Sequence, residues 1–92
     1  MSVKVKIPTP LRGLTSDQDT VGADGANTVG EAIQNLEQQF PGMRERLLDD
    51  TGELRRFVNI YVNGEDIRFM DGLGTSIKTG DEVSIVPAVA GG

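Results

Sequence analysis

The sequence predicts an α+β domain, in which a mixed β-sheet carries one main amphipathic helix packed on it. Residues 3–7 alternate between apolar and charged side chains, and residues 29–40 place apolar side chains at helical spacing. Residues 57–62 and 83–86 return to β-branched, strand-like patterns. The 92 residues correspond to one ordinary domain.

The first third of the chain predicts a hairpin. Val3, Val5 and Ile7 alternate with two lysines, which is typical of a strand with one buried face. Pro8 ends this strand, and a turn-like stretch leads to a second β-like segment over residues 20–23. We expect the two segments to pair.

The middle third predicts a helix that begins at Thr28. Glu31 follows Thr28 at the spacing of a capping box, in which the two side chains satisfy free backbone N–H groups. The apolar stripe consists of Val29, Ala32, Ile33, Leu36 and Phe40. Pro41 and Gly42 end the helix, and residues 43–50 predict a short helical turn that buries Leu47 or Leu48.

The last third predicts three strands. Val58, Ile60 and Val62 share one face of the first, and Asn63-Gly64 supplies the turn that tight hairpins need. We expect residues 67–69 to be the short partner strand and residues 83–86 to be the last strand. The order strand, strand, helix, strand, short strand, strand is that of a β-grasp, or ubiquitin-like, domain.

Composition excludes several function classes. Nine Lys and Arg against 14 Asp and Glu give a net charge of −5, which disfavours a nucleic-acid partner. The chain has no Cys and no His, so thiol and imidazole chemistry and the usual zinc ligands are absent. Asp17 and Asp19 begin a calcium-loop pattern, but Val21 and Thr28 stand where ligands are needed, and we predict no metal site. No apolar run approaches a membrane span, so we expect a soluble cytoplasmic protein and no membrane partner.

The C-terminus is the segment where chemistry is expected. We divide the chain into a domain over residues 1–87 and a flexible tail over residues 88–92 that ends in Gly91-Gly92. Two glycines, preceded by the small Ala90, can pass through a narrow channel and present the carboxylate of Gly92 without obstruction. A carboxylate is a poor acyl donor, so a partner enzyme that uses ATP must first activate it. An incidental Gly-Gly end is the alternative.

Two surface features could serve docking. Phe57, Tyr61 and Val86 are expected on the strand face opposite the core, where an apolar patch would suit an activating enzyme. There are two alternatives. The three residues are scattered exposed side chains of an ordinary surface, or the strand is shifted by one residue and they belong to the core. Four arginines, at positions 44, 46, 55 and 56, form either a basic patch for an acidic partner or an ordinary solvated surface.

The chain resembles the ThiS/MoaD family of ubiquitin-like sulfur carriers. The tail from Val86 to Gly92 is similar to the terminal motif of that family. The segments 56–63, 65–69 and 83–92 resemble in particular the thiocarboxylate carrier of O-phosphoserine-dependent cysteine biosynthesis. The resemblance covers nearly the whole chain and is weakest over residues 15–27 and 49–53.

The resemblance implies a protein co-substrate, not an enzyme. A MoeB-like enzyme would use ATP and magnesium to adenylate Gly92 and convert it to a thiocarboxylate. The sulfur would pass to a synthase that carries pyridoxal phosphate, and a metalloprotease would release cysteine. These cofactors would belong to the partners, and none would be bound by this chain.

Two related functions stay open. One is the small subunit of molybdopterin synthase, whose thiocarboxylated tail enters the large subunit. The other is a ubiquitin-like modifier, in which the same tail forms isopeptide bonds with lysines of target proteins.

Overall fold

A five-stranded mixed sheet forms the centre of the protein, whose computed structural model describes residues 2–87. In the sheet order β2-β1-β5-β3-β4, the central pair β1 and β5 is parallel and the other neighbours are antiparallel. The strands are β1 (Ser2–Lys6), β2 (Thr20–Asp24), β3 (Val58–Val62), β4 (Glu65–Asp66) and β5 (Glu82–Pro87). The predicted first hairpin is confirmed by the pairing of β1 with β2.

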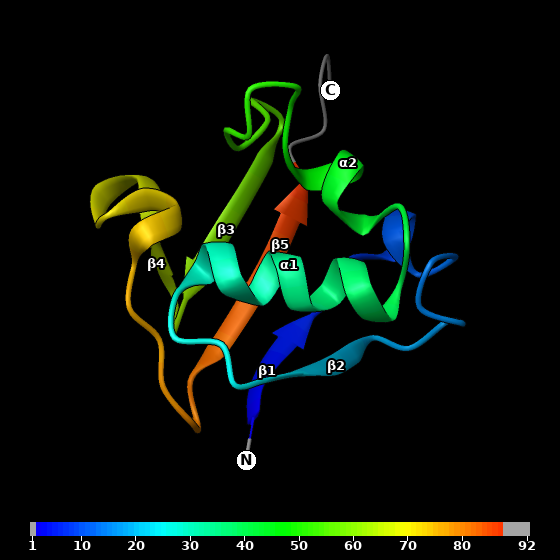
Figure 1. Ribbon diagram of the computed structural model, residues 1–92, viewed down its shortest axis with the longest axis horizontal. Coiled ribbons are helices and arrows are strands. Elements are labelled where there is room, and N and C mark those ends of the chain that lie inside the picture. Colours follow the sequence, from blue (N-terminus) through cyan, green and yellow to red (C-terminus); the bar gives the residue numbers. More distant parts are fainter. Residues whose placement is uncertain (1, 88–92) are drawn as a thin grey trace.

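The helices lie on one side of the sheet. The main helix α1 (Val29–Gln39) crosses one face, and the short α2 (Met43–Leu47) follows it near the tip of β5 (Figure 1). Three single 3₁₀ turns complete the chain: η1 (Thr9–Leu11), η2 (Ile67–Phe69) and η3 (Gly72–Gly74). One helix on one face of a mixed sheet is the predicted fold class.

The start of α1 has the predicted capping box with one change. The Thr28 hydroxyl accepts a hydrogen bond from the Glu31 N–H at 3.2 Å. The Glu31 carboxylate reaches one residue further back than usual and accepts from the N–H of Asn27 at 2.9 Å. One N–H group that the helix leaves free, that of Glu31, and the N–H group of Asn27 just before the helix are thereby satisfied.

A carboxylate on α1 fixes the start of α2. Glu37 accepts hydrogen bonds from the N–H groups of Gly42, at 3.2 Å, and of Arg44, at 2.8 Å. Gly42 has a φ of 103°, a conformation that glycine adopts without steric cost. Met43, Leu47 and Leu48 are buried behind this corner, so the predicted short helical turn is confirmed.

The core lies between α1 and the inner face of the sheet. It includes the predicted stripe of α1, except for Phe40, which is half-buried, and the predicted inner faces of the strands. The buried strand residues are Val3, Val5, Val21, Ala23, Val58, Ile60, Val62, Val83 and Ile85. Because burying one such side chain stabilises the fold by about 1.5–3 kcal/mol, this alternation determines which face of each strand turns inward.

The prediction of a strand over residues 67–69 is wrong. The partner of β3 is β4, at Glu65–Asp66, and residues 67–69 form the 3₁₀ turn η2. A strand would place Ile67 and Phe69 on the same face, whereas Ile67 is fully buried and Phe69 is 90 % exposed. The Asp66 carboxylate accepts from the N–H of Arg68 at 2.8 Å and starts the turn there.

The Asn63-Gly64 turn between β3 and β4 is confirmed. Both residues have positive φ, 51° and 90°, as a two-residue hairpin turn requires. The Asn63 side chain also bonds the loop before β5: its Nδ2 donates to Asp81 at 3.1 Å, and its Oδ1 accepts from the N–H of Glu82 at 3.0 Å. The hairpin is thus attached to the start of the last strand.

Candidate functional site

The predicted chemical site lies beyond the last described residue. Ala90, Gly91 and Gly92 are outside the described range, so the roles expected of them stay predictions. The described chain ends at Pro87, which pairs with Val58 at the first residue of β3. The base of the site is therefore the end of the sheet where β5 finishes and β3 begins.

The outer face of the sheet, which α1 does not cover, borders this base. Across β3 and β5, Asn59 faces Val86 and Tyr61 faces Ser84. Val86 is 43 % exposed and Tyr61 is half-buried. Further along the same face, the Lys6 ammonium and the Glu82 carboxylate form an ion pair at 3.2 Å.

The structure places the three predicted docking residues in the same part of the chain pairing, but only Tyr61 and Val86 lie on strands. Val86 is diagonal to Tyr61, a spacing of about 7–8 Å between Cα atoms. Phe57 precedes β3 rather than belonging to it, and 48 % of its surface is exposed. Phe57 and Val86 are thus exposed near the tail base and Tyr61 is half-buried, while the apolar patch and its docking role stay predictions.

Arg68 holds the start of β3 from the side. Its guanidinium donates to the carbonyl oxygen of Val58 at 2.8 Å and to that of Arg55 at 3.1 Å. A third hydrogen bond goes to Oδ1 of Asn59 at 2.5 Å. No local pattern in the sequence indicates this role of Arg68, because it depends on η2 folding back along β3.

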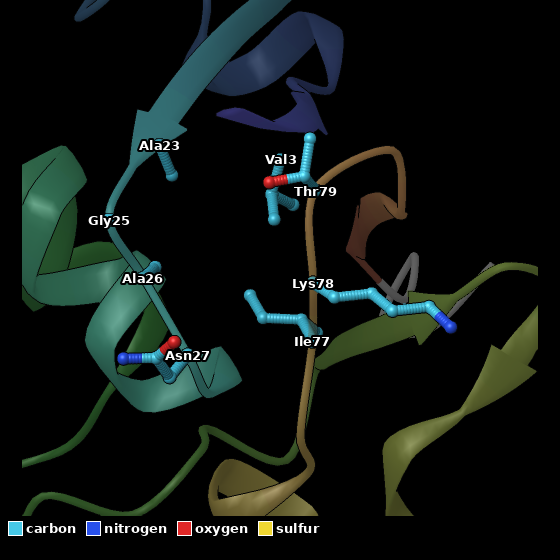
Figure 2. A pocket seen from close by; sticks show the side chains of 8 residues that line it. All are labelled: Val3, Ala23, Gly25, Ala26, Asn27, Ile77, Lys78 and Thr79. Atoms are coloured by element: carbon cyan, nitrogen blue, oxygen red, sulfur yellow. The ribbon is translucent and has the colours of Figure 1, made fainter. Parts of the chain in front are cut away.

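One hollow lies away from the tail base, and a second borders Arg68 beside the start of β3. A hollow of about 210 Å³ lies near the start of β1 and is lined partly by Ala26 and Ile77, while the Lys78 side chain points away from it (Figure 2). A second hollow of about 280 Å³ is lined by apolar side chains that include Leu54, Ile67 and Leu73. Neither contains the paired titratable groups that acid-base chemistry needs.

The titratable groups with altered pKa values serve structural turns. Hydrogen bonds from the Thr51 hydroxyl and then from the Glu53 N–H hold the pKa of Asp49 below its ordinary value. Hydrogen bonds from the Asn63 side chain and from the Lys78 N–H do the same for the pKa of Asp81. Within residues 2–87 no group of three acidic side chains is arranged to hold a metal ion. No helix in this range is long and apolar enough to cross a membrane.

The fold and the base of the site define a class of protein: a small ubiquitin-like β-grasp domain, whose last described strand ends at Pro87. The model of the ThiS family matches residues 5–92, and this range includes the whole tail. The sulfur carrier protein CysO of Mycobacterium tuberculosis is 54 % identical over 94 residues, which cover 100 % of both chains.

A solved structure of a CysO complex and a further relative are also similar to this chain. The crystal structure of the BexX/CysO complex of Amycolatopsis orientalis matches with a TM-score of 0.91 and 46 % identity, covering 99 % of this chain and 100 % of that one. Small archaeal modifier protein 3 of Haloferax volcanii is 41 % identical over 69 residues, covering 75 % of this chain and 74 % of that protein. The chain therefore belongs to the ThiS family and is a sulfur carrier rather than an enzyme, which confirms the resemblance and the predicted ubiquitin-like fold.

Proposed function

We propose that the chain carries sulfur as a thiocarboxylate on the C-terminal carboxylate of Gly92 and donates it in the biosynthesis of cysteine. One observation carries this proposal. The likeness to the CysO sulfur carrier of Mycobacterium tuberculosis extends over the full length of both chains, and the family match continues to residue 92. A likeness of the fold alone would not have to include the tail.

The chemistry requires a partner for activation. The carboxylate of Gly92 attacks the α-phosphorus of ATP, pyrophosphate leaves, and an acyl-adenylate forms on the partner enzyme. Sulfide then attacks the acyl carbon, and AMP leaves with one of the original carboxylate oxygens, so that a thiocarboxylate remains. We expect a MoeB-like enzyme to bind ATP and magnesium for both steps.

The domain and the tail divide the work in this proposal. Residues 1–87 act as the recognition domain, and residues 88–92 carry the reacting carboxylate into the partner. Gly91 and Ala90 keep the approach narrow, because neither has a side chain larger than a methyl group. Phe57, Tyr61 and Val86 provide the apolar contact surface at the base of the tail.

The sulfur acceptor is the finer part of the proposal. A thiocarboxylate sulfur is a soft nucleophile that adds to an activated alkene, such as an aminoacrylate held by pyridoxal phosphate on a cysteine synthase. The resulting cysteine is joined to the carrier, and a metalloprotease would hydrolyse that bond. In this proposal, all of these reactions take place in the cytoplasm.

Intact-protein mass spectrometry tests the first step. The chain is incubated with a MoeB-like enzyme, ATP, magnesium and a sulfide source, beside a variant that lacks Gly92. We expect the wild-type chain to gain the mass difference between one sulfur and one oxygen, and the shortened variant to gain nothing. Unchanged wild-type mass with several such enzymes would contradict the proposal.

A modifier function is the second candidate, because the chain is 41 % identical to small archaeal modifier protein 3 over 69 residues. In that case the activated tail would form an isopeptide bond with lysines of other proteins. Tryptic peptides from the host would then carry the C-terminal residues of this chain on lysine. Their absence, together with a detectable thiocarboxylate, would favour the carrier function alone.

A further inference from the structure

Five of the nine cationic side chains gather where β5 ends. Arg55 and Arg56 lie three and two residues before Val58, the first residue of β3, which pairs with Pro87. Arg68 bonds the carbonyl oxygens of Arg55 and Val58, so it lies at the same place. The remaining two, on α2, are Arg44 and Arg46.

α2 is joined to this group by a direct contact. The Nε of Arg55 donates to the carbonyl oxygen of Glu45 at 2.8 Å, which brings the middle of α2 beside the start of β3. Met43 and Leu47 turn inward and are buried, while Arg44 and Arg46 are exposed on either side of the exposed Glu45. Figure 1 shows α2 and the loop before β3 on either side of the tip of β5.

Within the described residues no ion pair joins Arg44, Arg46 or Arg56 to a carboxylate, and the exposed Glu45 lies between the first two on α2. The ion pair found there joins Lys6 to Glu82, on the outer face of the sheet. The nearby Asp49 carboxylate is turned into its own loop, where it accepts from Thr51 and Glu53. A chain with a net charge of −5 therefore exposes unpaired guanidinium groups beside its last strand.

We propose that Arg44, Arg46 and Arg56 form a docking surface for an acidic face of the enzyme that activates the tail. This inference rests on the proposed function. Guanidinium groups make paired hydrogen bonds with carboxylates, so the surface fits Asp and Glu side chains of a protein partner. The overall negative charge of the chain makes nucleic acid an unfavourable occupant.

The position of the surface gives it a role in orientation. Charge attraction accelerates the encounter of two proteins and selects their relative orientation before the apolar contacts form. Since the three arginines lie on α2 and just before β3, beside the end of β5, an acidic face that attracts them also draws the end of the last strand toward the partner. The apolar residues Phe57 and Val86 would then complete the contact.

Charge reversal with a matched control tests the proposal. Arg46→Glu and Arg56→Glu, singly and combined, are compared with Lys78→Glu, which makes the same change of charge in the loop before β5, at the opposite end of that strand. Acyl-adenylate formation is followed by ATP–pyrophosphate exchange with the MoeB-like enzyme over a range of carrier and salt concentrations. Thermal unfolding of each variant confirms that the fold is intact.

We expect each arginine reversal to raise KM for the carrier about tenfold, the lower end of electrostatic steering, with kcat unchanged. The dependence of kcat/KM on salt should become shallower, and Lys78→Glu should behave as wild type. Equal KM values for the arginine variants and Lys78→Glu would overturn the docking surface, while wild-type exchange would still support the carrier. A fall in kcat at unchanged KM would also overturn it, and a wild-type chain that is never adenylated would overturn the carrier function as well.

Discussion

The side-chain amide of Gln39 on α1 lies 2.9 Å from the carbonyl oxygen of Gly22 on β2 and donates a hydrogen bond to it. The same Nε2 donates to Oδ1 of Asn35 at 2.6 Å, and Nδ2 of Asn35 donates to the carbonyl oxygen of Asp24 at 2.7 Å. β2 is an edge strand of the sheet, and unpaired carbonyl groups on an edge strand can pair with a strand of another molecule. Two amides of the helix therefore cover this edge.

Gln39→Ala should uncover the edge of β2. We expect the free energy of unfolding to fall by about 1 kcal/mol, the usual net value of one hydrogen bond. Gln38→Ala is the matched control, because Gln38 is exposed one residue earlier on the same helix. Urea unfolding measures the difference, and size-exclusion chromatography at high concentration reports strand addition between copies. Equal midpoints for the two variants would contradict this role for Gln39.

Arg68→Ala should loosen the start of β3. Its guanidinium bonds Val58, Arg55 and Asn59, and the loss should lower the free energy of unfolding by about 1–3 kcal/mol. Arg68→Lys should recover little, since an ammonium group lacks the planar fork that reaches several acceptors at once. Denaturant unfolding beside the control Arg56→Ala distinguishes this effect from a simple loss of charge. Full recovery by lysine would show that charge alone matters.

Asp81 should make the fold sensitive to acid. Hydrogen bonds from Asn63 and Lys78 hold its pKa below the ordinary value of about 3.9. A lowered folded-state pKa stabilises the fold above the unfolded-state pKa, and this contribution is lost as the pH falls through the folded-state value. Melting temperatures between about pH 5 and pH 2 should therefore fall more steeply for wild type than for Asp81→Asn. Asp50→Asn, an equal change of charge at an exposed position, should keep the wild-type slope.

Val86→Asp should weaken recognition by the activating enzyme without unfolding the domain. Val86 is 43 % exposed on the outer face, so a carboxylate there is solvated but removes apolar contact with a partner. We expect KM for the carrier to rise, while the melting temperature stays near that of wild type. Phe69→Asp is the control, because Phe69 is 90 % exposed on η2 rather than on β5. Similar KM values for the two variants would remove Val86 from the docking surface.

Much of the fold follows from local patterns in the sequence. The alternation of Val58, Ile60 and Val62 and the Thr28–Glu31 spacing predict their strand and helix because neighbouring residues determine them. The error at residues 67–69 has a local cause as well, since the Asp66 carboxylate starts a 3₁₀ turn where apolar composition favours a strand.

The remaining features depend on contacts between distant segments. Gln39 reaches Gly22 across 17 positions, and Arg68 reaches Val58 across 10, so no local pattern indicates either contact. The gathering of Arg46, Arg55 and Arg68 likewise becomes visible only when α2, β3 and η2 are placed together. Of the candidate site, the sequence predicts the surface residues Tyr61 and Val86, and the roles of residues 90–92 stay predictions.

The parallel pairing of β1 with β5 has a practical consequence for handling the protein. Because the two central strands run in the same direction, the chain enters the sheet at one end and leaves it at the other, about 20 Å away for strands of this length. An affinity tag, a fluorophore or a sensor surface joined through the N-terminus is therefore held at the end of the sheet opposite Pro87. Immobilisation through the N-terminus should leave the end of the sheet at Pro87 facing the solution.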